Sequence, residues 1–427
     1  MNNELFDFIK KSPTAYHAVS AAAGMLEDAG AIRLSEKDEW KIEKGKKYFV
    51  TRNASSIIAF SVPEGGASGF MISAAHSDSP SFKIKPGGTI KGEHFVRLST
   101  EKYGGMLCAT WFDRPLSAAG RIVVKTEDGV ESRLVDLVRP VALIPSVAIH
   151  MNRSANDNAS YNPAVDMIPL VCEGERFSLE DETAKAAGVN AEDIVSEDLF
   201  VYVPEHGVEW NGLISAPRLD DLQCAFASLK AFISAKPCGS VSVMGIFDNE
   251  EVGSSTKQGA ASTFLEDTLK RISLSLGESG TEHLRALASS MMVSCDNAHS
   301  VHPNHPEYAD RGCCPVVNGG VVIKYNANQR YASDAVSAAL FSLICEKAGV
   351  PTQKYANRSD IPGGSTLGSI ANTKVSVNTV DVGLAQLAMH SCFETAGAAD
   401  TEYLVRALEE FFRSSVKDAG DGKYLLN

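Results

Sequence analysis

Apolar and polar residues follow two patterns along the chain, one helical and one strand-like. Apolar positions recur every three or four residues over 4–11 and 15–28, which predicts two amphipathic helices. Continuous apolar runs, partly β-branched, then occupy 47–51, 56–62 and 70–75. Because Asn, Pro and Gly separate these runs, we expect three strands joined by turns.

The pattern changes after about residue 86. As far as about residue 215 the candidate strands are short, for example 95–98, 121–125 and 141–144, and helical periodicity is rare. Beyond residue 216 helices and strands alternate again. The predicted helices cover 221–235, 333–348 and 402–412, and the predicted strands cover 241–247, 291–295 and 321–325.

These patterns predict an α/β fold class with an insertion. A parallel sheet needs crossover helices, which the middle of the chain does not supply. We therefore expect a three-layer α/β domain built from 1–86 and 216–427, interrupted by an all-β domain over 87–215. The length of 427 residues also favours two structural units.

Composition and charge exclude several classes of protein. No apolar run reaches the roughly 18 residues needed to cross a bilayer, so we expect no membrane partner. A net charge of -13 opposes binding to nucleic acid. The N-terminus lacks the pattern of a secretory signal, and the nine cysteines show no Cys-x-x-Cys spacing. A reducing cytoplasm is the expected location.

Two adjacent carboxylates, Glu250 and Glu251, follow the apolar run 241–247. Neighbouring glutamates on a turn point in different directions, so one can hold a metal ion while the other holds the attacking water. This arrangement favours metal-assisted hydrolysis. The alternative is a solvated acidic turn.

Two further segments have the same chemical character. The run 70–75 ends in His76, and Asp78 lies two residues on, close enough to orient a ligating imidazole. The alternative for this pair is a polar turn. Asp220 stands at the start of a predicted helix and has two oxygens that can bridge two cations, although Asp220 or Asp221 can equally be a helix N-cap.

Two more candidate ligands lie later in the chain. Asp296 follows the run 291–295, and His390 lies in an apolar stretch where the alternative is a buried core histidine. The five nitrogen or oxygen ligands are then His76, Asp220, Glu251, Asp296 and His390, with Glu250 left as the base. Imidazoles with carboxylates suit two divalent ions, expected to be zinc, and cobalt or manganese would also be accepted.

The chain resembles the aspartyl aminopeptidase family of dinuclear zinc exopeptidases. The resemblance covers nearly the whole length in family order, in the segments 12–18, 75–80, 149–153, 217–220, 248–254, 299–304, 328–332 and 386–391. It implies a zinc-exopeptidase catalytic domain with a β insert that mediates assembly into a tetrahedral dodecamer. It further implies removal of N-terminal Asp or Glu from peptides with a free α-amine.

The resemblance also assigns roles to the candidate residues. It implies that His76 and Asp296 hold one ion, that Glu251 and His390 hold the other, and that Asp220 bridges them. Glu250 is then the general base, and Asp78 supports His76.

The same resemblance places four residues around the substrate. His150 would donate to the oxyanion from the insert of a neighbouring subunit, although it can also be a structural histidine or a further ligand. Lys324 would attract an acidic side chain, together with Tyr331 and His299, unless it is only a solvated charge. The remaining alternatives are a preference for neutral residues, an amidase or deacylase, and a non-catalytic shell protein.

Overall fold

The computed structural model describes residues 1–174 and 177–427, and its largest element is a mixed nine-stranded sheet. In spatial order its strands are β1 (Ile32–Leu34), β2 (Lys47–Arg52), β3 (Ser56–Ser61), β13 (Val241–Phe247), β4 (Phe70–His76), β14 (Met291–Cys295), β18 (Asn378–Gly383), β16 (Val321–Tyr325) and β17 (Thr352–Ala356). The central strands β13, β4, β14 and β18 are mutually parallel. Every residue of β13, β4 and β14 is buried, as expected for parallel strands covered on both faces.

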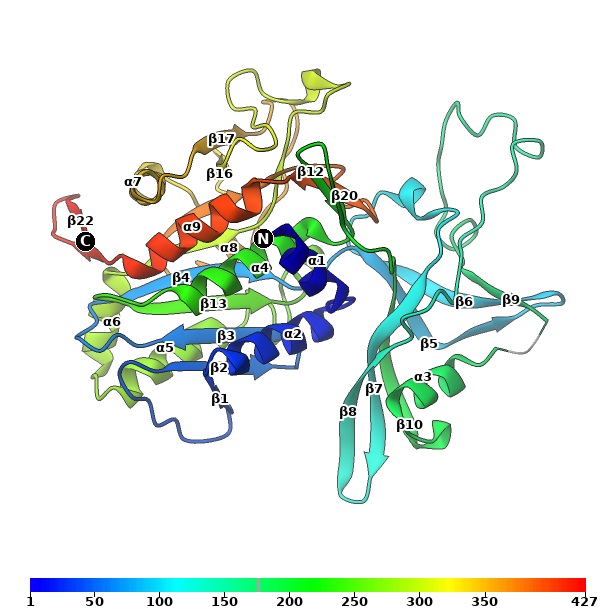
Figure 1. The fold of residues 1–427 in the computed structure, drawn as a ribbon, viewed down its shortest axis with the longest axis horizontal. Coiled ribbons are helices and arrows are strands. Elements are labelled where there is room, and N and C mark those ends of the chain that lie inside the picture. Colours follow the sequence, from blue (N-terminus) through cyan, green and yellow to red (C-terminus); the bar gives the residue numbers. More distant parts are fainter. Residues whose placement is uncertain (175–176) are drawn as a thin grey trace.

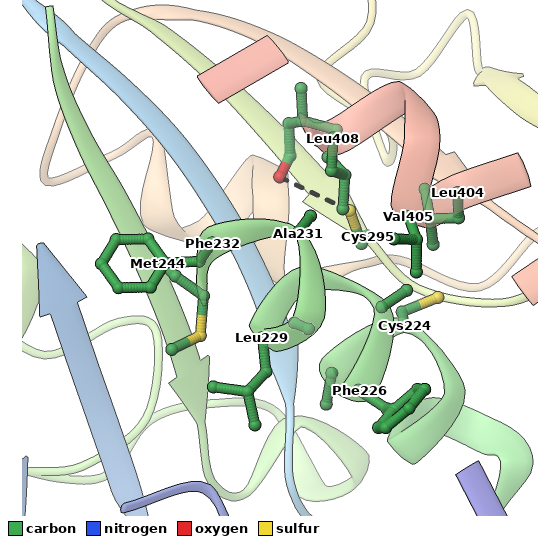
Figure 2. Close-up of a cluster of buried hydrophobic side chains, with 14 of the residues drawn as sticks. Cys224, Phe226, Leu229, Ala231, Phe232, Met244, Cys295, Leu404, Val405 and Leu408 are labelled. Carbon is green, nitrogen blue, oxygen red and sulfur yellow. Dashed lines mark hydrogen bonds between the residues drawn. The ribbon is translucent and has the colours of Figure 1, made fainter. Parts of the chain in front are cut away.

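Helices cover both faces of this sheet, which gives the predicted three layers (Figure 1). One face carries α1 (Asn2–Lys10), α2 (Ala15–Asp28), α4 (Leu219–Ser234), α7 (Ala335–Ala348) and α9 (Asp400–Arg413). The other carries α5 (Phe264–Ser275), α6 (Gly280–Ala288) and α8 (Leu367–Ala371). Figure 2 shows α4 beside α9, with Cys224 and Ala231 on the side of α4 that faces Val405 and Leu408, and α4 is buried nearly all round.

A six-stranded antiparallel sheet forms a second unit beside the first (Figure 1). In spatial order its strands are β8 (Gly129–Asp136), β7 (Ser117–Thr126), β10 (Ile194–Tyr202), β5 (Ser81–Lys91), β6 (Phe95–Tyr103) and β9 (Leu170–Glu173). The combination of an α/β part and a β part is confirmed. The predicted boundary at residue 86 falls inside β5, and the exact division into domains stays a prediction.

The second unit differs from its predicted elements in two places. The predicted strand over 141–144 is wrong, because these residues make only isolated bridges, such as Leu116 with Ala142. The unit also contains a helix, α3 (Leu179–Ala187), whose Ser178 side chain accepts the N–H of Asp181 and whose C-cap Gly188 has a left-handed backbone. These are ordinary helix-capping signals.

Short strands and turns complete the fold. A five-stranded sheet consists of β11 (Val208–Trp210), β12 (Leu213–Ala216), β20 (Glu394–Gly397), β19 (Ala385–Leu387) and β15 (Ala298–His299), and the C-terminus adds β21 (Val416–Asp418) with β22 (Tyr424–Leu426). The 3₁₀ turns are η1 (Cys108–Trp111), η2 (Ala191–Asp193), η3 (Glu250–Val252) and η4 (Pro306–Tyr308). Over the part of the chain that the structure describes, none of the helices combines the length and apolarity required to cross a bilayer.

The topology brings distant segments together at one edge of the large sheet. The parallel strands β4, β13 and β14 all end at this edge, and the residues that follow them are Ser77, Asp248 and Asp296. In open α/β sheets, ligands bind outside the carboxyl ends of the strands. This edge is therefore the first place to look for a functional site.

Candidate active site

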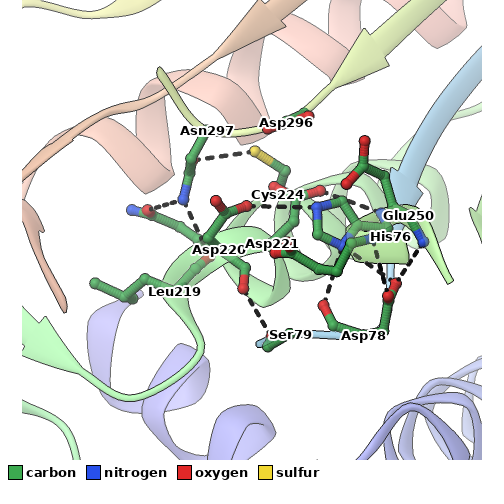
Figure 3. A network of polar contacts seen from close by, with 12 residues as sticks. His76, Asp78, Ser79, Leu219, Asp220, Asp221, Cys224, Glu250, Asp296 and Asn297 are labelled. Carbon is green, nitrogen blue, oxygen red and sulfur yellow. Dashed lines mark hydrogen bonds and ion pairs between the residues drawn. The ribbon is translucent and has the colours of Figure 1, made fainter. Parts of the chain in front are cut away.

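One cavity of about 190 Å³ lies at the carboxyl edge of the large sheet. It collects nine of the candidate residues from six separate segments, namely His76, Asp220, Glu250, Glu251, Asp296, His299, Lys324, Tyr331 and His390. Gly364 to Thr366 also line it, from the Gly-rich loop before α8. Segments up to about three hundred residues apart in sequence thus meet at one point, where several of the side chains face one another (Figure 3).

His76 is held so that one ring nitrogen faces the cavity. It is the last residue of β4 and is 1% exposed. Its Nδ1–H donates to the Asp78 carbonyl oxygen at 3.0 Å, which leaves Nε2 3.4 Å from Asp220 Oδ1. A hydrogen bond at one nitrogen fixes the tautomer and prepares the other nitrogen as a ligand.

His390 has the same arrangement on the opposite side of Asp220. Its Nδ1–H donates to the carbonyl oxygen of Gly105 at 2.5 Å. Its Nε2 lies 3.4 Å from Glu251 Oε1 and 3.6 Å from Asp220 Oδ2. Nε2 of His76 therefore faces one oxygen of the Asp220 carboxylate, and Nε2 of His390 faces the other oxygen.

The donor set fits divalent metal ions. Ligand atoms of His76, Glu250 and Asp296 lie within 4.8 Å of one another, and so do ligand atoms of His76, Asp220 and Glu251. Asp220 Oδ1 and Glu251 Oε1 are buried, and among the described residues neither accepts a hydrogen bond. Buried carboxylate oxygens without partners are costly unless a cation compensates them.

The electrostatics of the cluster agree with this fit. Burial alone would raise the pKa of Asp220, but the rings of His390 and His76 lower it below its usual range. Burial raises the pKa of Glu250 to about 8, and the charges of Asp296 and Asp78 act in the same direction. Several carboxylates close together in a buried site make an environment that favours cations.

A second carboxylate positions the acidic turn. Asp78 is 4% exposed, and its side chain accepts the backbone N–H groups of Glu250 and Glu251, both at 3.1 Å. It also accepts the hydroxyl of Tyr103 at 2.7 Å. Asp78 therefore holds both the His76 ring, through its carbonyl, and the turn that carries the two glutamates.

Glu394 is a supporting residue that the sequence patterns did not reveal. Its carboxylate accepts the N–H of Asp220 at 2.9 Å and the N–H of His390 at 2.7 Å. It is 2% exposed, at the start of β20. The available signal was its position four residues after His390, but the contact with Asp220 comes from tertiary structure alone.

Neither Asp220 nor Asp221 caps helix α4. The N-cap position is Arg218, in a left-handed backbone conformation and without a side-chain cap bond. Asp221 instead accepts the N–H of His76 at 3.2 Å, and the peptide bond between the two aspartates is cis. Both aspartates have non-helical backbone angles at a kink in α4, and among the described residues neither side chain makes a cap bond, since Asp220 lines the cavity and Asp221 accepts the His76 N–H.

Lys324 is buried rather than solvated. It is 3% exposed, its Nζ lies 3.3 Å from Asp296 Oδ1, and it lies over the Tyr331 ring at 5.5 Å from the ring centroid. Burial would lower the pKa of Lys324, but the Asp296 carboxylate raises it. A charged lysine therefore faces the cavity, and the ring of His299 lies edge-on to Tyr355 beside it.

His150 does not join this cluster within a single chain. It is exposed, in a turn of the β unit, and it is not among the described residues that line the cavity. Exposed apolar side chains lie beside it, including Val147, Ile149 and Met151.

Comparison with known proteins identifies the family. The family profile described as aminopeptidase I zinc metalloprotease (M18) matches residues 8–412. The chain belongs to the M18 aminopeptidase family. It is 43% identical over 422 residues to "Probable M18 family aminopeptidase 2" of Clostridium acetobutylicum, an alignment that covers 96% of this chain and 98% of the relative.

Solved structures of the M18 family agree with the fold. A chain in a cryo-EM structure of the Ape4 and Nbr1 complex is 37% identical, with a TM-score of 0.92, covering 96% of this chain and 84% of that one. A chain of the S. cerevisiae mApe1 dodecamer is 29% identical, with a TM-score of 0.83, covering 96% and 95%. The protein is therefore an M18 zinc metallo-exopeptidase, as the sequence motifs predicted.

Proposed function

We propose that this M18 aminopeptidase removes N-terminal Asp or Glu residues from peptides by means of two divalent metal ions. The observation that carries the proposal is the single cavity in which five metal-ligand candidates, Glu250 and the buried Lys324 meet. The proposed ligands are His76, Asp220, Glu251, Asp296 and His390.

The proposed division of ligands is the one that the family resemblance implies, and the distances at Asp220 support it. Its two oxygens face different histidines, at 3.4 Å and 3.6 Å, as expected for a carboxylate that bridges two ions. We assign His76 with Asp296 to one ion and Glu251 with His390 to the other. Zinc suits these ligands, and cobalt or manganese would also be accepted.

In the proposed mechanism Glu250 moves the proton. When bound, the two ions would act as Lewis acids toward the scissile carbonyl and the attacking water. Glu250 accepts a proton from that water and delivers it to the leaving amine. Asp78 keeps Glu250 in place through the backbone N–H, so the carboxylate of Glu250 stays free for this transfer.

The proposed acidic preference rests on Lys324. It is a buried cation in a cavity otherwise rich in carboxylates, and it lies on a different segment from the metal-ligand candidates. A buried ammonium attracts a carboxylate far more strongly than a neutral side chain. Tyr331 and His299 would complete the wall of this subsite.

The proposed assembly supplies His150. We propose that residues 87–215 mediate a homo-oligomer, a dodecamer like that of the mApe1 relative. His150 would then reach a neighbouring subunit's cavity and donate a hydrogen bond to the oxyanion of the tetrahedral intermediate. The exposed Val147, Ile149 and Met151 beside it support an interface at this place.

A substrate panel tests the proposal. Metal-free protein is reloaded with zinc, cobalt or manganese and given chromogenic amides of Asp, Glu, Leu, Ala and Lys, together with N-acetyl-Asp amide. We expect metal-dependent cleavage of the Asp and Glu amides, no cleavage of the acetylated compound, and a loss of roughly 10²- to 10⁴-fold in kcat for Glu250→Gln. Preference for Leu or Lys would overturn the Lys324 subsite, and cleavage of only the acetylated compound would indicate a deacylase.

A further inference from the structure

The end of strand β6 brings the β unit into contact with the candidate metal centre. Tyr103 is the last residue of β6, and Gly104 and Gly105 follow it. We call these three residues the β6 end. It approaches the turn that carries the two adjacent glutamates on one side and His390 on the other.

Tyr103 closes a ring of hydrogen bonds around the acidic turn. Its hydroxyl donates to Asp78 Oδ2 at 2.7 Å and accepts a side-chain N–H of Asn249 at 2.8 Å, since a phenol can donate and accept at once. Asp78 Oδ2 also accepts the backbone N–H of Glu251 at 3.1 Å. The turn is therefore held by the side chain of Asn249 and by the backbone of Glu251, and Tyr103 links the two contacts.

Both partners in the contact between Tyr103 and Asn249 are fixed by their own surroundings. The ring of Phe200, on β10 of the β unit, packs edge to face with the Tyr103 ring, with 5.5 Å between the centroids. The side-chain oxygen of Asn249 accepts hydrogen bonds from Thr256 and Gln258, both at 2.8 Å. The hydroxyl of Tyr103 therefore transmits the position of the β unit to the acidic turn.

Gly104 allows the chain to pass close to Glu251. Its φ is +76°, in the left-handed region that favours glycine. A Cβ at this position would lie 3.1 Å from the Cβ of Glu251, closer than carbon atoms normally pack. A residue with a side chain would therefore displace Glu251 or the β6 end.

His390 is held from the same place. The Gly105 carbonyl oxygen accepts its Nδ1–H at 2.5 Å, and the N–H of Leu107 donates to the His390 carbonyl oxygen at 3.0 Å. Nε2 of His390 lies 3.4 Å from Oε1 of Glu251. Glu251 and His390 are the two ligands assigned above to one ion, so the β6 end contacts both residues that this ion does not share with the other.

We propose that the β6 end positions the two ligands of one metal ion, Glu251 and His390. Tyr103 acts through Asp78 and Asn249, so it is a positioning residue rather than a catalytic one. The inference rests on the proposed two-ion function. It adds that the β unit builds part of the catalytic site of its own chain.

The other ion should depend less on the β6 end. Its assigned ligands, His76 and Asp296, stand at the ends of the buried strands β4 and β14 of the large sheet. A disturbance of the β6 end should therefore weaken the binding of one ion and leave the other bound.

Two variants disturb the β6 end, and each has a matched control in the β unit. Tyr103→Phe removes a bond between a phenol and a carboxylate, and so does Tyr202→Phe, because the Tyr202 hydroxyl donates to Asp136 at 2.6 Å within the β unit. Gly104→Asn adds a side chain at a left-handed position, which asparagine tolerates. Gly87→Asn does the same at a φ of +68°, where an added Cβ would meet no atom of a described residue within 4 Å.

Two measurements report on the metal ligands directly. Competition with a chromogenic chelator gives the two zinc affinities, and the visible absorption of the cobalt-loaded protein reports the ligand geometry. We expect Tyr103→Phe and Gly104→Asn to weaken one zinc affinity about tenfold, the lower end of the range for groups that support ligands, and to change the cobalt spectrum. Anomalous diffraction at limiting zinc should show reduced occupancy beside Glu251 and His390, whereas both controls should match the unmodified protein.

Thermal denaturation shows which variants are folded, and Tyr103→Phe alone decides if Gly104→Asn does not fold. Normal zinc affinities and a normal cobalt spectrum in either folded variant would overturn the inference and leave the proposed function intact. Equal weakening of both ions, or the same loss in the controls, would also overturn it, because the effect would then be a general loss of stability. An unmodified protein that binds fewer than two ions would overturn the proposed function and this inference together.

Discussion

The contact between Glu394 and two candidate ligands gives a sharp prediction for Glu394→Gln. The carboxylate accepts the Asp220 N–H with one oxygen and the His390 N–H with the other. Glutamine has the same shape but only one acceptor oxygen, and its amide NH₂ is a donor. One of the two backbone N–H groups must therefore face another donor.

The size of the effect follows from the bond that is lost. A hydrogen bond to a charged group contributes about 1.5–3 kcal/mol. Since about 1.4 kcal/mol corresponds to a factor of ten, losing one such bond should weaken metal binding about 10- to 100-fold. Changes in groups that support metal ligands typically cost the same range in affinity or activity, about 10- to 100-fold.

Competition with a chromogenic chelator measures this loss. Glu402→Gln is the matched control, because Glu402 is an exposed glutamate on α9 and its replacement changes the net charge equally. We expect the control to bind zinc like the unmodified protein. Zinc affinity and kcat within twofold of normal in Glu394→Gln would refute the positioning role of Glu394.

Three further changes should have measurable effects. Removal of the metal ions by a chelator should lower the melting temperature reversibly, because the buried carboxylates of Asp220 and Glu251 then repel each other. Adding the ions back at a free concentration a thousandfold above Kd should restore about 4 kcal/mol to the free energy of unfolding. In the folded protein burial lowers the pKa of His17 to about 4, whereas a histidine in an unfolded chain has a pKa of ~6.5. At pH values between these two pKa values, unfolding is therefore accompanied by the uptake of one proton. Stability should therefore fall as pH drops from about 6.5 to about 4, and His17→Asn should flatten this slope in denaturant titrations. Lys324→Met should lower kcat/KM for an Asp amide about 10- to 100-fold more than for a Leu amide, because only the Asp amide loses a charge-assisted hydrogen bond. An equal loss of kcat/KM on both substrates would contradict the acidic subsite.

Most of the metal-site candidates could be proposed from the sequence because they stand beside a recognisable apolar run, and their role as metal ligands stays a prediction. His76, Glu251 and Asp296 stand at or just after the ends of parallel strands, and strand ends can be read from the hydrophobic pattern. The parallel order of β13, β4 and β14 then brings these residues together at one sheet edge. His390 follows the short strand β19, and here the family resemblance contributed more than the local pattern.

The supporting contacts could not be predicted in the same way. Glu394 and Tyr103 carry no local signal for their partners, because those partners lie 174 and 25 residues away in sequence. Helix α3 was missed although Ser178 and Gly188 are typical capping residues, since few apolar positions mark it. Side-chain partners set by tertiary contacts are beyond what periodicity and turn residues encode.

The β unit orients His390 within the same chain through Gly105, just after β6. The proposed role of His150 is different, because this exposed residue would act in the cavity of a neighbouring subunit, and subunit mixing tests it. His150→Ala and Glu250→Gln should each be nearly inactive alone. In a randomly mixed oligomer, about a quarter of the sites combine an intact Glu250 with a neighbour's intact His150, so co-refolding equal amounts should restore activity to about a quarter of normal. Mixed oligomers, verified by two affinity tags, that are no more active than either variant alone would show that His150 does not act across the interface.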